Sequence, residues 1–469
     1  MIVMIAFSFL LINTNTVAAD TTTVGNSGNE NYTSIQKAVN NSVDGDTILV
    51  NKGTYIENVD IDKKLTIISK SGNPEDTIIQ AFHPYDHVFH VTANNVTIKG
   101  FGLRNSSSAS GIYLDNVQYN TIANNHLQAN GIGIHLWNAA RNNILINNTA
   151  SDNSWSGIRL TPDDSELASN NTLINNTMVN NTYNFEIYTG YENASMQNNI
   201  DTTNTVNGKP IYYLVNVSDV TLNSASNAGA IYCINCQNMT IKDQVLQNNS
   251  LSIALFNTSN SRFDSNILSN NAVGVILFNS DNNTGLNNIA VNNMFGIAIV
   301  ESTDNYLSNN VANSNGIGFD VHESTNTELN NNTANNNKAN GVALSSSIQN
   351  KVNGNIANYN LYGDGINLFN CSNSLLNNNI ANSNRYAGID LGSSRDNVLT
   401  DNIANSNGKH GFELAGSNNN TLRGNIGNSD VDHLPDDSPN RTSTNETKDQ
   451  SIENKSFISS LISAVFSWV

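Results

Sequence analysis

Pairs of polar and aromatic residues recur at one spacing in the first half of the chain. Each pair stands two and four residues after a glycine or, once, an asparagine, with apolar residues between. The pairs are Tyr113/Asp115, His135/Trp137, Arg159/Thr161 and Glu186/Tyr188. A period of two puts both members on the outward face of a strand. Aromatic faces suit sugar rings, and charged groups supply hydrogen bonds, so the pattern predicts a carbohydrate-binding face with Asp163 and Asp164 at its rim.

Two other interpretations of this face stay open. Mixed polar and aromatic residues are common on a solvated β-surface that binds nothing. The face is also compatible with the cleft of an enzyme acting on polysaccharide, a lyase, hydrolase or epimerase. The Asn-Thr-Asp, Gly-His-Gly and Arg-Ile-Lys motifs of polygalacturonase-type enzymes are absent as a set, and Asp163-Asp164 alone does not replace them.

A second carboxylate pair lies near the end of the repeats. Asp390 and Glu413 each follow a glycine by two residues in consecutive repeats, which predicts a separation of roughly 5 Å if the repeats stack as strands. Such a distance resembles the carboxyl spacing of retaining glycosidases, and the like charges are expected to raise one pKa. Their neighbours Gly392 and Ala415 offer no sugar subsite, so a structural role is favoured.

One histidine cluster and three cysteines are the candidates for metal or redox chemistry. His83, His87 and His90 are weak metal candidates, since His87 and His90 are expected on opposite faces of an extended segment. Cys233 is predicted to point into a core and Cys236 to the opposite face, which favours packing over redox or metal use. Cys371 falls in the same repeat column as Cys236 but six repeats away, too far for a disulfide.

The elements that position all these residues are coils of one repeat. Seven copies begin at glycines separated by 22 to 24 residues, each with apolar residues one and three positions later: Gly274, Gly296, Gly318, Gly341, Gly365, Gly388 and Gly411. A fixed step of this size indicates a solenoid. A coil of this length cannot bury its apolar face alone and must stack on its neighbours at about 4.8 Å. The sequence therefore predicts an all-β fold, a right-handed parallel β-helix.

Asparagine makes up about a fifth of the chain and recurs in fixed columns. One column contains Asn310, Asn332, Asn355, Asn379 and Asn402. In stacked coils such amides can donate to and accept from the coil above and below. The regular apolar columns argue against a disordered asparagine-rich chain, which is the competing interpretation of this composition.

The start of the array carries a short helix and a recognisable opening. Thr33 to Asn40 predicts an amphipathic helix that caps the N-terminal coil, with Thr33 and Gln36 as a capping box. The stretch Ser34-Ile-Gln36, Gly45-Asp-Thr-Ile48 and Gly53-Thr-Tyr-Ile-Glu57 resembles the opening of pectin-lyase-like β-helix proteins with the carbohydrate-binding and sugar-hydrolase (CASH) repeat. That resemblance implies the same fold.

An irregular segment at about 193–230 breaks the period. It contains Val206-Asn-Gly-Lys-Pro-Ile-Tyr-Tyr213, followed by Ile231-Tyr-Cys-Ile-Asn-Cys236. Together with the coils, this combination is similar to the NosD family, which is associated with nitrous-oxide-reductase maturation and often described as periplasmic copper-binding. The resemblance implies copper as a ligand and a copper-handling accessory role. The residues themselves show no methionine-rich or cysteine-rich copper site.

The sequence at the two ends of the chain predicts an N-terminal signal peptide and a C-terminal extension beyond the β-helix. Residues 1–19 have the apolar run and Val17-Ala-Ala19 cleavage site of a signal peptide, so the mature chain is expected outside the cytoplasm, secreted or on the cell surface, without a transmembrane span. Residues 20–428 form the β-helix, 429–455 an acidic disordered linker, and 456–469 an amphipathic segment that caps the last coil or contacts a lipid or partner. Several Asn-x-Ser/Thr triplets suit a glycoprotein.

Charge narrows the list of partners. The formal net charge of −18 disfavours nucleic acid and anionic membranes. The favoured function is a non-enzymatic surface protein that binds a polysaccharide or cell-envelope glycan, or serves as an envelope scaffold. A polysaccharide-active enzyme and a copper-handling protein are the alternatives.

Overall fold

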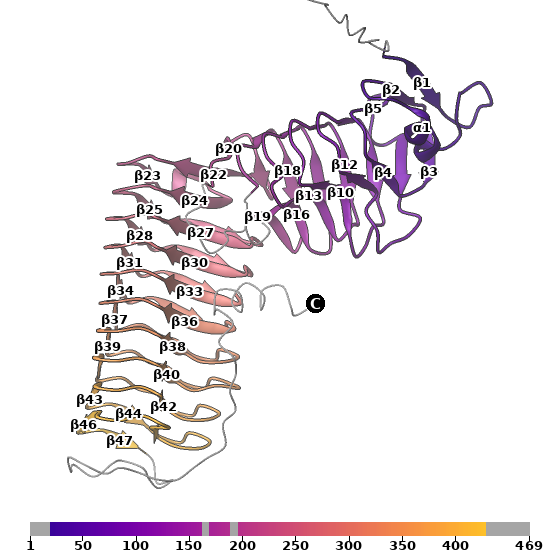
Figure 1. Ribbon diagram of the computed structural model, residues 1–469. Coiled ribbons are helices and arrows are strands. Elements are labelled where there is room, and N and C mark those ends of the chain that lie inside the picture. Colours follow the sequence, from indigo (N-terminus) through magenta and orange to yellow (C-terminus); the bar gives the residue numbers. More distant parts are fainter. Residues whose placement is uncertain (1–18, 162–167, 188–195, 428–469) are drawn as a thin grey trace, which may run out of the picture.

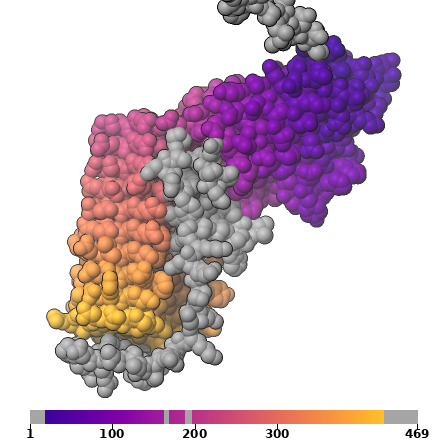
Figure 2. Space-filling view, viewed as in Figure 1, coloured from indigo at the N-terminus to yellow at the C-terminus, as the bar shows by residue number. Residues whose placement is uncertain are grey.

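The computed structural model describes residues 19–161, 168–187 and 196–427. Short parallel strands stack into two arms that meet at an angle, a first array from β1 to β21 and a second from β22 to β47 (Figure 1). The two arms stay distinct in the space-filling view (Figure 2). The predicted right-handed parallel β-helix is confirmed. The signal sequence up to residue 18, the linker and the C-terminal segment lie outside the described residues.

The first array has three sheets. One sheet contains β1 Thr21–Val24, β2 Thr47–Val50, β5 Thr66–Ser69, β8 Thr97–Lys99, β11 Thr121–Ala123, β14 Ile144–Ile146, β17 Thr172–Ile174 and β20 Asn199–Ile200. Another contains β3 Gly53–Ile56, β6 Thr77–Gln80, β9 Gly102–Arg104, β12 His126–Gln128, β15 Thr149–Ser151, β18 Thr177–Val179 and β21 Thr205–Val206. The third, called here the first long-strand sheet, contains β4 Val59–Ile61, β7 Phe89–Val91, β10 Ser110–Asp115, β13 Ile132–Trp137, β16 Ser156–Thr161 and β19 Tyr183–Ile187.

The second array repeats this plan. Its long-strand sheet contains β22 Lys209–Val215, β24 Ala230–Ile234, β27 Leu251–Phe256, β30 Val273–Phe278, β33 Phe295–Val300, β36 Ile317–His322, β38 Val342–Ser345, β40 Ile366–Phe369, β42 Ile389–Gly392 and β45 Phe412–Glu413. A second sheet contains β23 Thr221–Leu222, β25 Thr240–Lys242, β28 Arg262–Asp264, β31 Thr284–Leu286, β34 Tyr306–Ser308, β37 Glu328–Asn330, β39 Lys351–Asn353, β41 Leu375–Asn377, β43 Val398–Thr400 and β46 Thr421–Arg423. The remaining strands are β26 Val245–Gln247, β29 Ile267–Ser269, β32 Ile289–Val291 and β35 Val311–Asn313, with β44 Ile403–Ala404 and β47 Ile426–Gly427 further along.

The N-terminal helix is present, but its cap is one residue later than predicted. Helix α1 spans Ile35–Asn41, and the hydroxyl of Ser34, not Thr33, accepts from the N–H of Lys37 at 3.2 Å. Glu57, on the strand side, accepts from the backbone N–H of Ile35 and of Gln36, both at 3.0 Å. A carboxylate at a helix N-terminus satisfies free N–H groups and stabilises the helix dipole. The helix packs against β1, β2 and β4 and covers the first coil, as expected.

Asparagine ladders hold the corners of the coils. The backbone N–H of Asn288 and its side-chain Nδ2 both donate to Oδ1 of Asn310, at 2.9 and 2.8 Å, and Nδ2 also donates to the carbonyl of Phe263 at 3.0 Å. The same pattern recurs in register along the column Asn266, Asn288, Asn310, Asn332, Asn355, Asn379, Asn402 and Asn425. The ladder satisfies buried backbone groups at turns where no strand partner exists.

The irregular segment is the junction between the two arrays. Strand β21 pairs antiparallel with β22, with Val206 opposite Lys209, across the two-residue turn Asn207-Gly208. Both turn residues have positive φ, 49° and 76°, as a tight hairpin that follows strand twist requires. Strand β22 then pairs in parallel with β24 and starts the second array. Two large hydrophobic clusters are present: one fills the first array and extends across the junction to Tyr232 and Phe256, and the other fills the interior of the second array.

Candidate functional site

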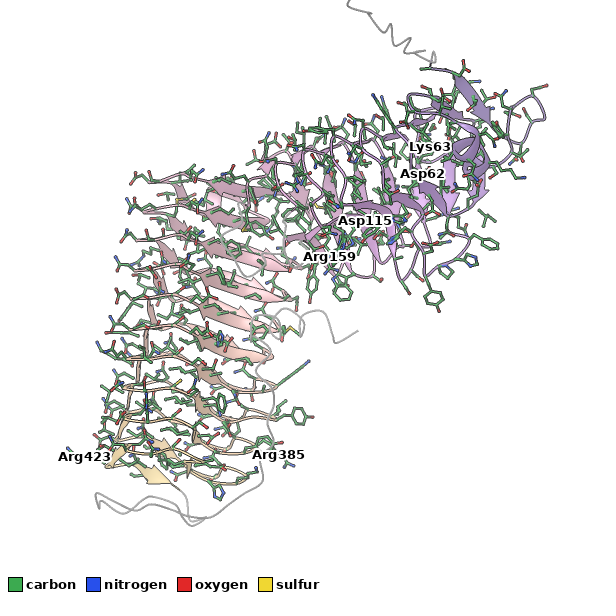
Figure 3. All side chains as sticks on the ribbon, viewed as in Figure 1. Asp62, Lys63, Asp115, Arg159, Arg385 and Arg423 are labelled. Atoms are coloured by element: carbon green, nitrogen blue, oxygen red, sulfur yellow. The ribbon has the colours of Figure 1, made fainter. Side chains whose placement is uncertain are left out.

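The outward face of the first long-strand sheet aligns six ionisable or aromatic side chains. Strand register places them next to one another in the order Asp60, His90, Tyr113, His135, Arg159 and Glu186. The sequence predicted the last four of these as neighbours, and the structure brings them together and adds Asp60 and His90. Asp115, Trp137 and Thr161 form a second column two residues further along the same strands. Figure 3 labels Asp115 and Arg159 on this side of the first array.

Aromatic rings run continuously across the middle of this face. The ring of His87 stacks on Tyr113, with centroids 4.1 Å apart and planes 7° from parallel. Tyr113 lies 5.2 Å from His135, and His135 lies 5.5 Å from Trp137, edge to face. We call His87, Tyr113, His135 and Trp137 the aromatic row. Such contacts hold the rings in fixed orientations, as a preformed binding surface requires.

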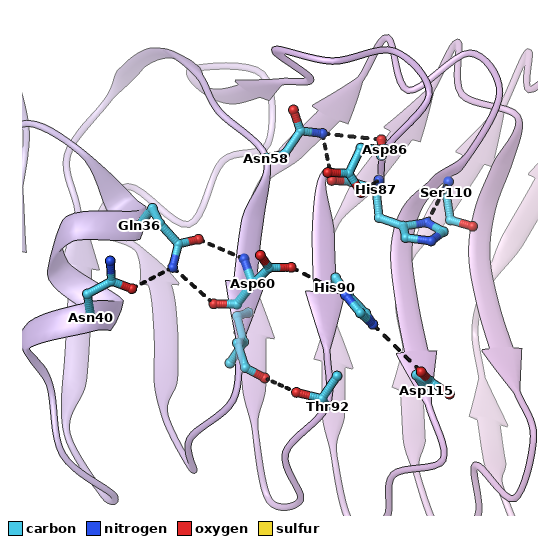
Figure 4. A network of polar contacts seen from close by, with 11 residues as sticks. Gln36, Asn40, Asn58, Asp60, Asp86, His87, His90, Thr92, Ser110 and Asp115 are labelled. Carbon is cyan, nitrogen blue, oxygen red and sulfur yellow. Dashed lines mark hydrogen bonds and ion pairs between the residues drawn. The ribbon is translucent and has the colours of Figure 1, made fainter.

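Carboxylates border the row on one side. His90 faces Asp60 through Nδ1 at 3.3 Å and Asp115 through Nε2 at 3.8 Å (Figure 4). The side chain of Asp60 is 80% exposed and that of Asp115 is 35% exposed. Their oxygen atoms are therefore open to a ligand that carries hydroxyl or amine donors.

The residues that hold the row are neutral or paired. Nδ1 of His87 accepts from the N–H of Ser110 at 3.0 Å, and burial lowers the pKa of His87 to about 4. His135 contacts Oγ1 of Thr161 through Nε2 at 2.7 Å, and burial followed by the charge of Arg159 lowers the pKa of His135 well below its usual value. Burial also raises the pKa of Tyr113. At neutral pH these three rings carry no charge.

Arg159 and Glu186 form an ion pair at the end of the column nearest the junction. Nε of Arg159 lies 3.4 Å from Oε1 of Glu186, whose side chain is 1% exposed. Oε2 of Glu186 accepts from the hydroxyl of Ser156, and the Arg159 guanidinium lies over the ring of Trp155 at 5.4 Å. The sequence predicted Arg159 and Glu186 as glycan contacts. In the structure they compensate each other's charge and stabilise the end of the face.

The structure adds one aromatic element that the sequence prediction missed. The loop between β6 and β7 carries Phe82 and Tyr85, which are 63% and 82% exposed, and leads into His87 of the aromatic row. The sequence pattern that could have predicted this loop is the pair of aromatic residues on either side of Pro84. Tyr188, Asp163 and Asp164 lie outside the described residues, so their predicted role stays a prediction.

The histidine and cysteine pairs deviate from the predicted alternation. His87 and His90 were expected on opposite faces, but β7 begins only at Phe89, and their rings lie 5.7 Å apart on the same face. Cys236 was expected to face away from Cys233, but β24 ends at Ile234 and both thiols are buried in the core. Contact with the Cys236 thiol, together with burial, raises the pKa of Cys233. In both cases the chain turns where an extended strand was assumed.

The second carboxylate pair is in the predicted register. Asp390 pairs with Glu413 on adjacent strands, and Nδ2 of Asn367 donates to Asp390 at 2.9 Å. Burial, followed by the charges of Asp364 and Glu413, raises the pKa of Asp390 to about 7. The expected pKa rise is confirmed in direction, although burial is its largest cause.

The family models match the residues that form the junction and the coils. The family described as periplasmic copper-binding protein (NosD) matches residues 39–228 and 204–364, which is more than half of the chain. The chain belongs to the NosD family. A family described as right handed beta helix region matches residues 350–431. The NosD match includes the Asn207-Gly208 junction, which the sequence resemblance had singled out.

Copper, which the NosD description implies, does not fit the residues that the structure describes. Nδ1 of His87 is occupied by the N–H of Ser110, and Nδ1 of His90 faces Asp60. Within residues 19–161, 168–187 and 196–427, no three histidine, cysteine, aspartate or glutamate side chains are grouped to hold a metal ion. The weak candidates His83, His87 and His90 therefore do not assemble a site here, and no chemistry through copper follows.

Comparison with known proteins also finds one cell surface glycoprotein and several solved structures. A cell surface glycoprotein of Methanothermus fervidus is 29% identical over 152 residues, which is 30% of this chain and 25% of the relative. This chain thus spans about a quarter of that relative. The A-module of mannuronan C-5 epimerase AlgE6 from Azotobacter vinelandii is 12% identical over 84% of this chain and 93% of that chain, with a TM-score of 0.38. An alginate lyase from Paenibacillus sp. is 13% identical over 63% and 95%, with a TM-score of 0.33.

Neither of the helical segments in the described part of the chain, α1 and the short 3-10 turn Ser224–Ser226, has the length and apolar character needed to cross a membrane.

Proposed function

We propose that this NosD-family protein is a non-enzymatic β-helix of the cell surface that binds a neutral polysaccharide on the outward face of its first array. The observation that carries the proposal is the aromatic row, in which rings from two successive coils and from the loop of the preceding coil are fixed against one another. Strand stacking repeats the surface at about 4.8 Å, close to the length of one sugar unit in an extended chain. A polymer is therefore a better match than a single sugar.

Charge on this face favours a neutral polymer over an acidic one. Arg159 is the cation in the column, and its charge is compensated by Glu186. His87 and His135 are uncharged at neutral pH, whereas Asp60 and Asp115 keep exposed carboxylates beside the rings. Carboxylates accept hydrogen bonds from sugar hydroxyls and repel uronate groups.

Exposed rings next to the row supply platforms for stacking. Phe82 and Tyr85 are largely exposed, and Trp137 is half-buried at the edge of the row. An aromatic side chain pays little conformational entropy when it binds, because it has few rotatable bonds. We expect these three residues to contribute more to affinity than the buried members of the row.

The proposed location rests on sequence and family. Residues 1–19 have the pattern of a signal peptide, the NosD description is periplasmic, and one relative is named a cell surface glycoprotein. We propose that residues 429–455, which are acidic, link the β-helix to the C-terminal segment. An envelope scaffold is compatible with the same location, and glycan binding is the property that distinguishes the two.

The proposal is tested by affinity electrophoresis in gels containing neutral or uronate-rich polysaccharides. Retardation is expected with at least one neutral polymer, and Tyr85→Ala and Trp137→Ala should each weaken it about tenfold, equal to about 1.4 kcal/mol. Tyr119→Ala is the matched control, because Tyr119 is also exposed in the first array but lies outside the row. Equal retardation of all three variants, or retention only by uronate polymers, would overturn the proposal.

One observation favours a polysaccharide-active enzyme as the second candidate. His87 is a neutral imidazole at neutral pH whose Nδ1 accepts the N–H of Ser110, so its Nε2 carries the proton and can donate a hydrogen bond to a substrate oxygen beside the proposed binding surface. Incubation with the same polysaccharides, followed by analysis for shorter or unsaturated products, separates the two candidates. Products that disappear in His87→Gln would establish the enzyme, and retardation without products supports binding alone.

A further inference from the structure

An apolar patch lies on the outside of the second array. Six of its residues come from four adjacent strands of the long-strand sheet, β27, β30, β33 and β36: Leu251, Val273, Ile276, Phe295, Ala298 and Ile317. Val273, Phe295 and Ala298 form a cluster apart from the one that fills the interior of these coils, whereas Leu251 and Ile276 also pack against the cluster that extends from the first array across the junction. Val273, Phe295 and Ala298 are buried although they do not belong to that interior. We call this surface the outer patch.

A buried carboxylate borders the outer patch. Asp320 on β36 is in register with Ala298 on β33 and is only 1% exposed. Neither of its carboxylate oxygens has a hydrogen-bond partner in the described part of the chain, and burial raises the pKa of Asp320 to about 7. An unpaired buried carboxyl group is costly, which points to a covering element that offers hydrogen-bond donors at this position.

The chain itself contains a segment with matching chemistry. Apolar residues recur at helical spacing in residues 456–469: Phe457, Ile458, Leu461, Ile462, Val465, Phe466 and Val469. Serines occupy most of the positions between them, and no residue of the segment has a charged side chain. Serine hydroxyls can donate to Asp320, and the absence of acidic side chains avoids like-charge repulsion.

The length of residues 456–469, and the number of residues before them, also match the size and position of the outer patch. A helix of 14 residues is about 21 Å long, and the four strands of the outer patch cover about 15 Å across the stack. Four strand spacings, about 19 Å, separate the Glu413 strand β45 from the Asp320 strand β36. The 28 residues from 428 to 455 can span up to about 95 Å when fully extended, so their length is sufficient for the segment to reach the patch.

We propose that residues 456–469 dock as an amphipathic helix on the outer patch, so that the C-terminus folds back along the side of the second array instead of capping its last coil. The apolar face of the segment packs on Leu251, Ile276 and Phe295, and Ser459, at the edge of that face, lies beside Asp320. Docking on a patch four strands wide also joins coils that otherwise contact only their immediate neighbours.

Trp468 gives the segment its own probe. The chain has three tryptophans, and in the full chain with Trp137→Phe and Trp155→Phe only Trp468 fluoresces. Docking predicts a blue-shifted emission maximum that is independent of protein concentration. Ile276→Lys, on the outer patch, should shift the emission to the red, and Leu461→Lys in the segment should do the same.

Ile289→Lys is the matched control, since Ile289 belongs to the same coil as Ile276 but is 39% exposed on another sheet. Emission that stays blue-shifted in Ile276→Lys would overturn the proposal, because the segment would then pack elsewhere, for example on the last coil. A blue shift lost on dilution, together with dimers by light scattering, would assign the patch to a second copy. Emission that shifts only with phosphatidylglycerol vesicles would assign the segment to a lipid surface.

Discussion

The imidazole of His87 lies flat against the phenol ring of Tyr113, with centroids 4.1 Å apart, and its Nδ1 accepts the backbone N–H of Ser110. This arrangement requires a neutral His87, because a protonated Nδ1 could no longer accept that hydrogen bond. The loop that carries Phe82 and Tyr85 is thereby tied to the strand that carries Tyr113. Acid should therefore loosen the loop and the binding face together.

The first prediction concerns the pH dependence that arises from His87. Its pKa is about 4 in the folded protein and near 6.5 in the unfolded chain, so the unfolded chain binds more protons between these values. Stability from this group is present above about pH 6.5 and is lost as the pH falls toward 4. His87→Gln should reduce this slope in thermal melts recorded from pH 4 to 7. His83→Gln is the control, because His83 is exposed in the same loop; equal slopes in the two variants would contradict the prediction.

The second prediction concerns the ion pair at the end of the column. Arg159→Met leaves the buried Glu186 without its cation and should destabilise the first array by about 3 kcal/mol, as the loss of one partner of a buried pair typically does. The double variant Arg159→Met/Glu186→Gln should recover much of this loss, since glutamine still accepts from Ser156. Urea denaturation followed by circular dichroism measures both. Additive losses in the double variant would show that the two residues do not act as a pair.

The fold could be predicted because the same residue types recur at the same positions of each repeat, and this recurrence defines the register between strands of consecutive coils. Asp390 and Glu413, Tyr113 and His135, and the asparagine ladder all lie where the spacing put them. The stacking partner of each strand residue can be obtained by counting residues alone. Counting does not give the direction of a side chain at the end of a strand. The predictions for His87 and Cys236 were wrong because β7 begins after His87 and β24 ends before Cys236.

The candidate site was predicted in its strands but not in its loop. Tyr113, His135, Trp137 and Arg159 were identified from the strand pattern, whereas Phe82 and Tyr85 follow no period. The bend between the arrays had a local signal, the Asn207-Gly208 pair, but its meaning depends on which strands flank it. The burial of Asp320 had no local signal, since an outward position in a strand is ordinarily solvated.

The third prediction concerns the asparagine ladder. Asn310 is fully buried and serves as acceptor for the N–H and Nδ2 of Asn288 and as donor to the carbonyl of Gly285. Asn310→Ala leaves these groups unsatisfied and should cost about 2–4 kcal/mol. Asn425→Ala is the matched control at the end of the same ladder, half-buried and next to the last coil. Hydrogen exchange of the Asn288 amide should accelerate in the first variant and stay unchanged in the second.

The fourth prediction concerns Asp320, whose pKa of about 7 lies above the value near 3.8 of a free carboxyl group. Between these values the folded protein holds a proton that the unfolded chain has released, so this group lowers stability as the pH rises from about 4 to about 7. An asparagine side chain cannot ionise, so Asp320→Asn should be more stable than the native chain at pH 8, by an amount on the order of a few kcal/mol, and nearly equal to it at pH 4.

Because His87 produces a slope of the opposite sign in the same pH window, the total pH profile of the native chain does not isolate Asp320. The difference in melting temperature between Asp320→Asn and the native chain does, since every other group cancels in it. That difference should grow from pH 4 to pH 8. A constant difference for Asp320→Asn would mean that the carboxyl is solvated in solution, and the outer patch would then have no cover at this point.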